Sequence, residues 1–234
     1  PVPRPEIFRA LRTVAPTIHM CNDAADPPWW PTLEEYNRED CFDVQVAIDG
    51  SYDCPIPTFK NGLVALTPID VRPFQPKPWE QRDIKLGMIG GIGHTGRREI
   101  VQRLQGAGVL RFDEGPVGRT YDQMAAQLCD CKCVFNYGVT GSGARLQVKG
   151  RVVEAGFAGA VLFELAGSPA RNWFTPDKDY FEYENAEGLI KLMSEVSDPE
   201  LAVVAARLRV EVWKNHHPLV FWEKVLDKAG VILC

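Results

Sequence analysis

Residues 85–105 read KLGMIGGIGHTGRREIVQRLQ, and this stretch decides the class of fold. Residues 85–89 have the apolar character of a buried strand, and residues 97–105 are predicted to form a helix. A glycine-rich loop, residues 90–96, joins them. The same order of strand, loop and helix recurs through the rest of the chain, which indicates an α/β protein.

The alternation continues to the C-terminus. The pattern predicts strands at 109–112, 131–137, 160–165 and 180–183, and helices at 120–128, 148–157, 186–196, 199–215 and 218–229. Strands that alternate with helices of this length predict a Rossmann-like, doubly wound parallel sheet.

The first 80 residues are less regular and predict an abbreviated N-terminal α/β domain. They contain a predicted helix at 5–14, strands at 17–21, 42–48 and 63–66, and a helix capped by Thr32. Residues 72–79, RPFQPKPW, cannot sustain a helix or an interior strand, because three prolines lack N–H donors. We therefore predict an N-terminal domain and linker at 1–80, a C-terminal Rossmann-like domain at 81–217, and a terminal helix at 218–234.

Composition excludes several classes of protein. The 234 residues are 45% hydrophobic and 24% charged, which is typical of a globular chain and not of a disordered one. No apolar run approaches the roughly 18 residues of a membrane-spanning helix. The net charge of -5 argues against a nucleic-acid partner. The chain begins PVPRP without an initiator methionine, so we expect it to be part of something longer.

The seven cysteines favour a reducing, cytoplasmic environment, because they are odd in number and irregularly spaced. Residues 129–133 read CDCKC, which lacks the second cysteine pair of a structural zinc site. On a strand, alternate cysteines share one face and behave as small apolar side chains. We predict that they belong to the core and that the chain holds no metal.

The glycine-rich loop has the context of a phosphate-binding turn. Gly90, Gly91 and Gly93 allow backbone N–H groups to approach an anion at the start of a helix. Arg97 in the first helical turn can add charge-assisted hydrogen bonds. An NAD(P)-dependent oxidoreductase is an alternative, because Asp113 and Glu114 lie near the position of the ribose-binding acid in such enzymes.

Residues 149–159, KGRVVEAGFAG, precede the apolar strand at 160–165 and bear on this choice. They resemble the donor-site helix of GT-B glycosyltransferases, in the family 4-like branch that includes the spore-maturation-type enzymes. Further segments fall in the order of that family: residues 66–70, 82–84, 174–177, 180–183 and 215–217.

The resemblance implies that residues 81–217 bind a nucleotide-sugar and that the terminal helix at 218–234 packs back on the N-terminal domain. It also implies roles for single residues. Glu154 would accept hydrogen bonds from the ribose of a nucleotide-diphosphate sugar, which is the donor substrate. Lys149 and Arg151 would neutralise the diphosphate, where negative charge develops. His94 would contact the donor sugar or phosphate. The resemblance further implies metal-independent transfer to a hydroxyl acceptor on a glycan, a protein or a small molecule, with no other cofactor.

One position departs from the family. Many retaining members carry a second glutamate eight residues before the ribose-binding one, and here that position is Leu146. The stereochemical outcome is therefore left open, and a nucleotide-sugar-binding protein without catalysis is a second hypothesis. Residues 141–147, GSGARLQ, are an alternative source of backbone N–H groups for the sugar or phosphate.

Acidic and aromatic residues cluster after the first predicted strand. Asp23 and Asp26 are candidate general bases for the acceptor hydroxyl, and Trp29 and Trp30 are candidates to stack on sugars. The alternative is structural: the aspartates cap turns and the indoles pack between elements.

Overall fold

The computed structural model describes residues 4–93, 95–114 and 120–231, and its chain divides into two compact units. The larger unit comprises residues 69–138 and 149–216. The smaller unit combines residues 1–68, 139–148 and 217–234. The chain thus leaves the larger unit after residue 138, contributes residues 139–148 to the smaller unit, and returns to the larger unit at residue 149.

The larger unit is built on a five-stranded parallel sheet. Its strands are β4 (Ile84–Gly90), β5 (Arg111–Glu114), β6 (Cys131–Phe135), β7 (Val161–Leu165) and β8 (Phe181–Tyr183), in the order β5-β4-β6-β7-β8. The prediction of a Rossmann-like parallel sheet is confirmed.

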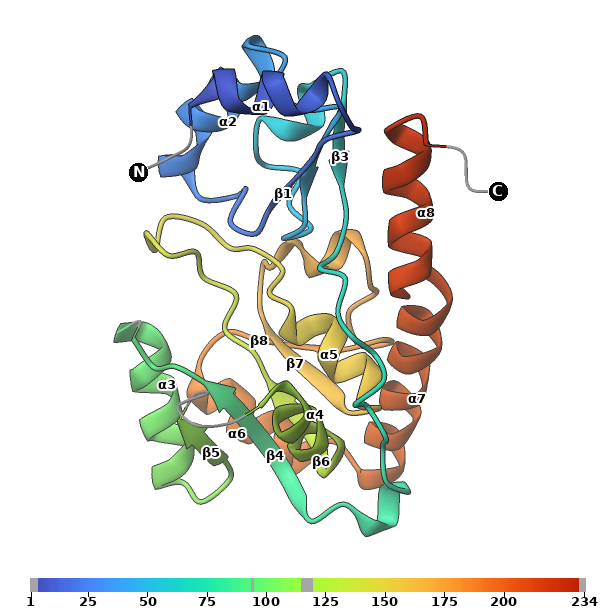
Figure 1. The fold of residues 1–234 in the computed structure, drawn as a ribbon. Coiled ribbons are helices and arrows are strands. Elements are labelled where there is room, and N and C mark those ends of the chain that lie inside the picture. The colour runs from blue at the N-terminus through green and yellow to red at the C-terminus, as the bar shows by residue number, and fades with distance from the viewer. Residues whose placement is uncertain (1–3, 94, 115–119, 232–234) are drawn as a thin grey trace. The chain divides into compact units, whose positions relative to one another are not determined.

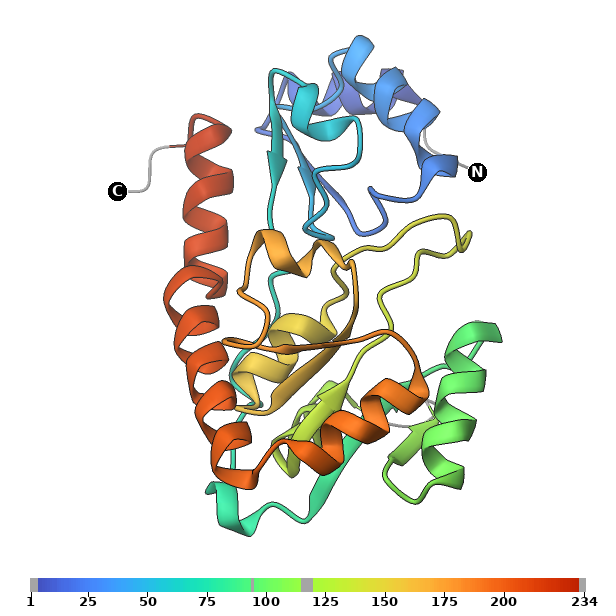
Figure 2. The ribbon, with the colours of Figure 1, turned by 180° about the vertical axis from the view of Figure 1, so that it is seen from behind.

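Helices cover both faces of this sheet. They are α3 (Thr95–Gly106), α4 (Tyr121–Cys129), α5 (Arg151–Phe157), α6 (Ala186–Glu195) and α7 (Asp198–Asn215). Figure 1 shows α4 in front of the sheet, and Figure 2, the view from behind, shows α6 on the other face. Helix α3 packs on α6, while α5 packs on α4 and α7. Leu104 of α3 and Leu189 of α6 are fully buried with Phe163 of β7 in the main core.

The strand order creates a switch point between β4 and β6. The chain passes from β4 to β5 in one direction and then returns across β4 to β6. Right-handed crossovers place the helices on opposite faces for the two directions. The carboxyl ends of β4 and β6 therefore open onto a crevice, which is where ligands bind in open α/β sheets.

The smaller unit contains a three-stranded parallel sheet in the order β1-β2-β3. Its elements are α1 (Pro5–Arg12), β1 (Ile18–Cys21), α2 (Trp30–Arg38), β2 (Val44–Ala47), β3 (Gly62–Val64) and α8 (Pro218–Lys228). Phe221 and Val225 of α8 are buried against Val44 and Val46 of the central strand.

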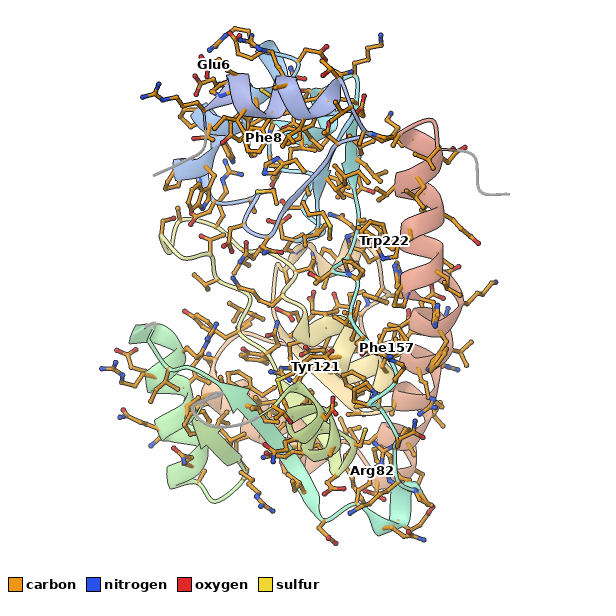
Figure 3. The ribbon with its side chains drawn as sticks, viewed as in Figure 1. Glu6, Phe8, Arg82, Tyr121, Phe157 and Trp222 are labelled. Carbon is orange, nitrogen blue, oxygen red and sulfur yellow. The ribbon has the colours of Figure 1, made fainter. Side chains whose placement is uncertain are left out.

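Short 3-10 helices connect several of these elements. They are η1 (Pro27–Trp29), η2 (Ile56–Thr58), η3 (Trp79–Gln81) and η4 (Pro169–Asn172). Residues 71–78 form neither helix nor strand, as their prolines predict, but Phe74 is buried within the larger unit, where its ring contacts Tyr121 and Phe157. Figure 3 shows Tyr121 and Phe157 in this part of the unit.

Several helices begin one to three residues from their predicted starts, among them α5 and α2. Helix α5 starts at Arg151, three residues later than predicted, and the Val148 N–H donates to the Asp49 carbonyl at 2.9 Å. Helix α2 starts at Trp30, so Thr32 lies in its first turn and does not cap it. The preceding 3-10 turn, η1, carries the chain directly into α2.

Candidate functional site

A cavity of about 400 Å³ lies at the switch point, entirely within the larger unit. Its walls come from the carboxyl ends of β4 and β6 and from the starts of α3 and α5. The lining residues are Met88, Ile89, Gly90, Arg97, Phe135, Asn136, Tyr137, Lys149, Gly150, Arg151 and Glu154. Five of the predicted binding residues are therefore brought together: Gly90, Arg97, Lys149, Arg151 and Glu154.

Arg97 forms the wall on the side of α3. Its guanidinium donates to the carbonyls of Gly91 at 2.8 Å and Tyr137 at 3.1 Å, and it lies 5.6 Å from the centre of the Tyr137 ring. Its Nε is buried and has no hydrogen-bond partner among the described residues. Its hydrogen bonds go to neutral carbonyls, and among the described residues no carboxylate forms an ion pair with Arg97.

Arg151 and Glu154 form the wall on the side of α5. Arg151 donates from Nη2 to the Ile89 carbonyl at 2.8 Å, and its Nη1 lies 3.1 Å from Glu154 Oε2. Both side chains are largely buried, at 13% and 11% exposure. The pair joins the first turn of α5 to the end of β4, so the carboxylate has a fixed place in the cavity.

The cavity has an excess of positive charge. Three cations, Arg97, Lys149 and Arg151, line it together with one carboxylate, Glu154. Burial lowers the pKa of Arg97, since an apolar environment disfavours the charged form. An anionic ligand would offset this cost, and guanidinium groups bind phosphate oxygens well. The site therefore suits a phosphate-bearing ligand.

The backbone of the glycine loop supports the wall of the cavity that Arg97 forms. Gly90 has φ +148, which side chains rarely allow, and it lets β4 turn into the loop. A Cβ at Gly96 would collide with the Tyr137 hydroxyl, so a larger residue there would require the Tyr137 side chain to move. Gly91 contributes its carbonyl to Arg97, and Gly93 is exposed outside the lining residues. His94, a predicted catalytic residue, lies outside the described residues.

A buried polar network behind the cavity was missed by the predictions from sequence. Asn136 follows β6, and its side chain donates to Glu164 of β7 at 2.6 Å. The Tyr183 hydroxyl donates to the Asn136 carbonyl at 2.5 Å. A polar residue at the carboxyl end of a central strand is a signal that could have revealed Asn136.

Asp23 and Asp26 lie in the smaller unit, where both bind the segment 139–148. Asp23 accepts a hydrogen bond from Gln147 Nε2 at 2.9 Å. Asp26 accepts from the Ser142 N–H at 3.0 Å through one oxygen and from the Ser142 hydroxyl through the other. Asp26 is only 4% exposed. The contacts anchor the segment 139–148 on the turn after β1.

Several backbone N–H groups of this segment have acceptors. The Ser142 N–H donates to Asp26, as described above. The Gly143 N–H donates to the Thr140 carbonyl at 3.0 Å, and the Ala144 N–H donates to Ser142 Oγ at 3.2 Å. These three N–H groups therefore already have acceptors, and the hypothesis that backbone N–H groups of residues 141–147 bind sugar or phosphate stays a prediction.

The tryptophans of the same region differ in their surroundings. Trp30 donates from its indole N–H to Ala24 O at 2.9 Å, and Arg145 lies 4.9 Å from the centre of its ring. Trp29 is 45% exposed. Trp30 is thus fixed within the smaller unit, whereas the Trp29 indole is open to solvent.

The cysteine cluster lies in the core. Cys129, Cys131 and Cys133 are at most 1% exposed, and burial raises the pKa of all three thiols. Over the described ranges, no group of three histidine, cysteine or acidic side chains could hold a metal ion. No helix in the same ranges is long and apolar enough to cross a membrane. The cytoplasmic location stays a prediction.

A family model described as glycosyl transferase-like matches residues 97–227, more than half of the chain. The matched range includes Arg97, Lys149, Arg151 and Glu154. The chain therefore belongs to this glycosyl transferase-like family. No curated protein matches the sequence.

Solved structures of GT-B glycosyltransferases share the fold. HepE from Anabaena, in complex with UDP and glucose, has a TM-score of 0.66 at 10% identity, over 98% of this chain and 76% of that one. A mutant of TarM from S. aureus, in complex with fondaparinux, alpha-GlcNAc-glycerol and UDP, has a TM-score of 0.65 at 13% identity, over 97% and 54%. Sucrose-phosphate synthase from Thermosynechococcus elongatus has a TM-score of 0.58 at 11% identity, over 97% of this chain and 69% of that one. The family model favours a glycosyltransferase over the oxidoreductase alternative, and the shared fold is consistent with that family.

Proposed function

We propose that the protein transfers a sugar from a UDP-sugar to a hydroxyl acceptor, as a family 4-like, spore-maturation-type glycosyltransferase. The observation that carries the proposal is the switch-point cavity, in which three cations surround one buried carboxylate. This arrangement fits a nucleoside diphosphate, because the cations suit its negatively charged diphosphate and the carboxylate suits the hydroxyls of its neutral nucleoside. The acceptor is a glycan, a protein or a small molecule with a free hydroxyl.

The cations would act on the leaving group. Negative charge develops on the nucleoside diphosphate as the glycosidic bond breaks, and fixed positive groups stabilise that charge. Arg97 and Arg151 are held by backbone carbonyls at 2.8 Å, so little reorganisation is required of them. Because Arg97, Lys149 and Arg151 supply this charge, we propose that transfer needs no metal, and that EDTA leaves the rate unchanged.

Glu154 would bind the ribose. Its carboxylate is held beside Arg151 at 3.1 Å and lines the cavity, so it can accept hydrogen bonds from a vicinal diol. Uridine is the proposed nucleoside because HepE and TarM, which share the fold, were solved with UDP.

A thermal-shift panel tests the proposal. UDP-, GDP- and TDP-sugars are compared with NAD and NADP, and a ligand that binds the folded state stabilises it by RT ln(1 + [L]/Kd). We expect a shift with a UDP-sugar and none with the dinucleotides. Stabilisation by NAD alone would overturn the proposal in favour of an oxidoreductase.

A release assay then separates transfer from binding. UDP released from UDP-sugars is measured with and without candidate hydroxyl acceptors, in the presence of EDTA. Leu146 replaces the second glutamate of many retaining relatives, and this favours a binding protein as the second candidate. Binding without transfer or donor hydrolysis would support that second candidate.

A further inference from the structure

Asn136 offers one polar atom to the switch-point cavity. Its backbone N–H donates to Phe163 O at 2.9 Å, and its carbonyl accepts from the Tyr183 hydroxyl at 2.5 Å. Its side-chain Nδ2 donates to Glu164 at 2.6 Å. The carboxamide oxygen is the acceptor that these bonds leave over, and Asn136 lines the cavity.

Glu164 decides which way this carboxamide points. It is completely buried on β7, and in its ionised form it only accepts hydrogen bonds. The amide nitrogen of Asn136 therefore faces Glu164 when the carboxylate is ionised, as it is above pH 7, and the amide oxygen then faces away from it. The reverse orientation would bring two acceptor oxygens together at hydrogen-bond distance.

Some neighbours of Glu164 raise its pKa and others lower it. Burial raises its pKa to about 7, and Glu182 of β8 adds to the rise, while Asn136, the Leu165 N–H and the Ser168 hydroxyl favour the carboxylate. Tyr180 and Tyr183 also lie near it, and burial keeps both phenols protonated by raising each pKa. The ionised form therefore has its firmest partner in Asn136.

We propose that Glu164 orients Asn136 so that its carboxamide oxygen selects a ligand that donates a hydrogen bond from its nucleoside. The inference deepens the proposed function and rests on it. The donor can be the imide N–H of the base or a hydroxyl of the ribose, which share this chemistry. Asn136 contacts the ligand, and Glu164 is a positioning residue.

Analogues of UDP distinguish the two sources. N3-methyl-UDP lacks the imide N–H, whereas 2′-deoxy-UDP and 3′-deoxy-UDP each lack one hydroxyl. Wild-type protein should bind the analogue without the critical donor about tenfold more weakly than UDP, which is the usual effect of one hydrogen bond to a buried acceptor. Calorimetric titration measures each dissociation constant.

Variants test whether the preference for UDP over the critical analogue depends on Asn136 and Glu164. Asn136→Ala should lower the preference for UDP over the critical analogue about tenfold, because the acceptor oxygen is gone; any preference that remains for a ribose hydroxyl is then due to Glu154. Glu164→Met should also weaken it, since the carboxamide is then free to turn, and Glu164→Gln should restore part of it through an amide oxygen. Glu182→Gln is the control: its carboxylate is hydrogen-bonded to Tyr180 and Arg171 and not to Asn136, so the preference should persist.

The outcomes separate the two proposals. If UDP stabilises the wild type but binds no better than any analogue, the inference about Asn136 fails and the proposed function stands. The same conclusion follows if Asn136→Ala keeps every wild-type preference. If no nucleotide binds at all, both proposals fail together.

Discussion

Arg151 and Glu154 are one helical turn apart on α5, and their charged atoms meet at 3.1 Å inside the cavity. Arg151 is also tied to β4 through the Ile89 carbonyl at 2.8 Å. The pair therefore connects the helix to the adjacent wall of the site. It holds a carboxylate in a cavity that is otherwise cationic, which is an arrangement suited to a ligand with a diol next to a diphosphate.

Glu154→Gln should weaken UDP binding by roughly tenfold to a hundredfold, because hydrogen bonds to a charged acceptor contribute about 1.5–3 kcal/mol. Titration calorimetry with UDP measures the change. Glu99→Gln, an exposed position on α3, is the matched control and should keep wild-type affinity. Equal affinities for Glu154→Gln and wild type would remove Glu154 from the site.

Arg97→Lys should lose affinity for UDP by about tenfold while uridine binding changes little, because an ammonium cannot reproduce the two-pronged guanidinium contacts. Arg98→Lys is the control, since Arg98 is the exposed neighbour on the same turn. Affinities for UDP and uridine are compared in each variant. A loss of the same size for both ligands would mean that Arg97 supports the fold and does not bind the diphosphate.

Much of the larger unit follows from local patterns in the sequence. The glycine loop at 90–96 predicts the β4–α3 turn, and the segment 149–159 predicts the helix that carries Arg151 and Glu154. These signals work because capping, glycine geometry and apolar periodicity act over a few residues.

The part that could not be predicted depends on long-range contacts. Asp26 and Ser142 are 116 residues apart, and nothing local marks them as partners. The Val148 N–H also donates to the carbonyl of Asp49, which is distant in the sequence. Asn136 and Glu164 likewise meet only because β6 and β7 are neighbours in the sheet.

Asp26→Ala and Ser142→Ala should have similar effects, because each removes the same anchor of the segment 139–148. We expect each to lower stability by about 1–2 kcal/mol, and the double variant to cost less than the sum. Urea unfolding gives the free energies, and UDP release gives kcat. If Asp26→Ala abolishes kcat while Ser142→Ala retains it, Asp26 is instead the general base.

Glu164 should make stability fall as pH rises. Its pKa is about 7 in the folded state and about 4.5 when unfolded, so the folded state binds the proton more tightly. The stabilisation is complete below pH 4.5 and is lost towards pH 7, by about 3 kcal/mol for a group that is fully buried. Urea unfolding gives the free energies of unfolding of wild type and Glu164→Gln across this range. The stability of wild type relative to Glu164→Gln should fall as the pH rises. A constant difference would show that Glu164 does not titrate there.

Gly156→Ala should destabilise the protein even though alanine favours helices. A Cβ at this position would lie 2.7 Å from both methyl groups of Val212, which is fully buried on α7. Overpacking of this kind costs about 1–3 kcal/mol, more than the gain of up to about 1 kcal/mol in helix propensity.

Two further variants test the steric explanation. Gly188→Ala on α6 is the control, because its Cβ would meet only Asn185 Oδ1 at 3.6 Å, so the melting temperature should not fall. Adding Val212→Ala to Gly156→Ala should recover part of the loss, since the clash and the shortened side chain then offset each other. If the two changes are simply additive, the close approach of α5 to α7 is not the cause. UDP affinity should fall with Gly156→Ala alone, because the helix that must shift carries Arg151 and Glu154.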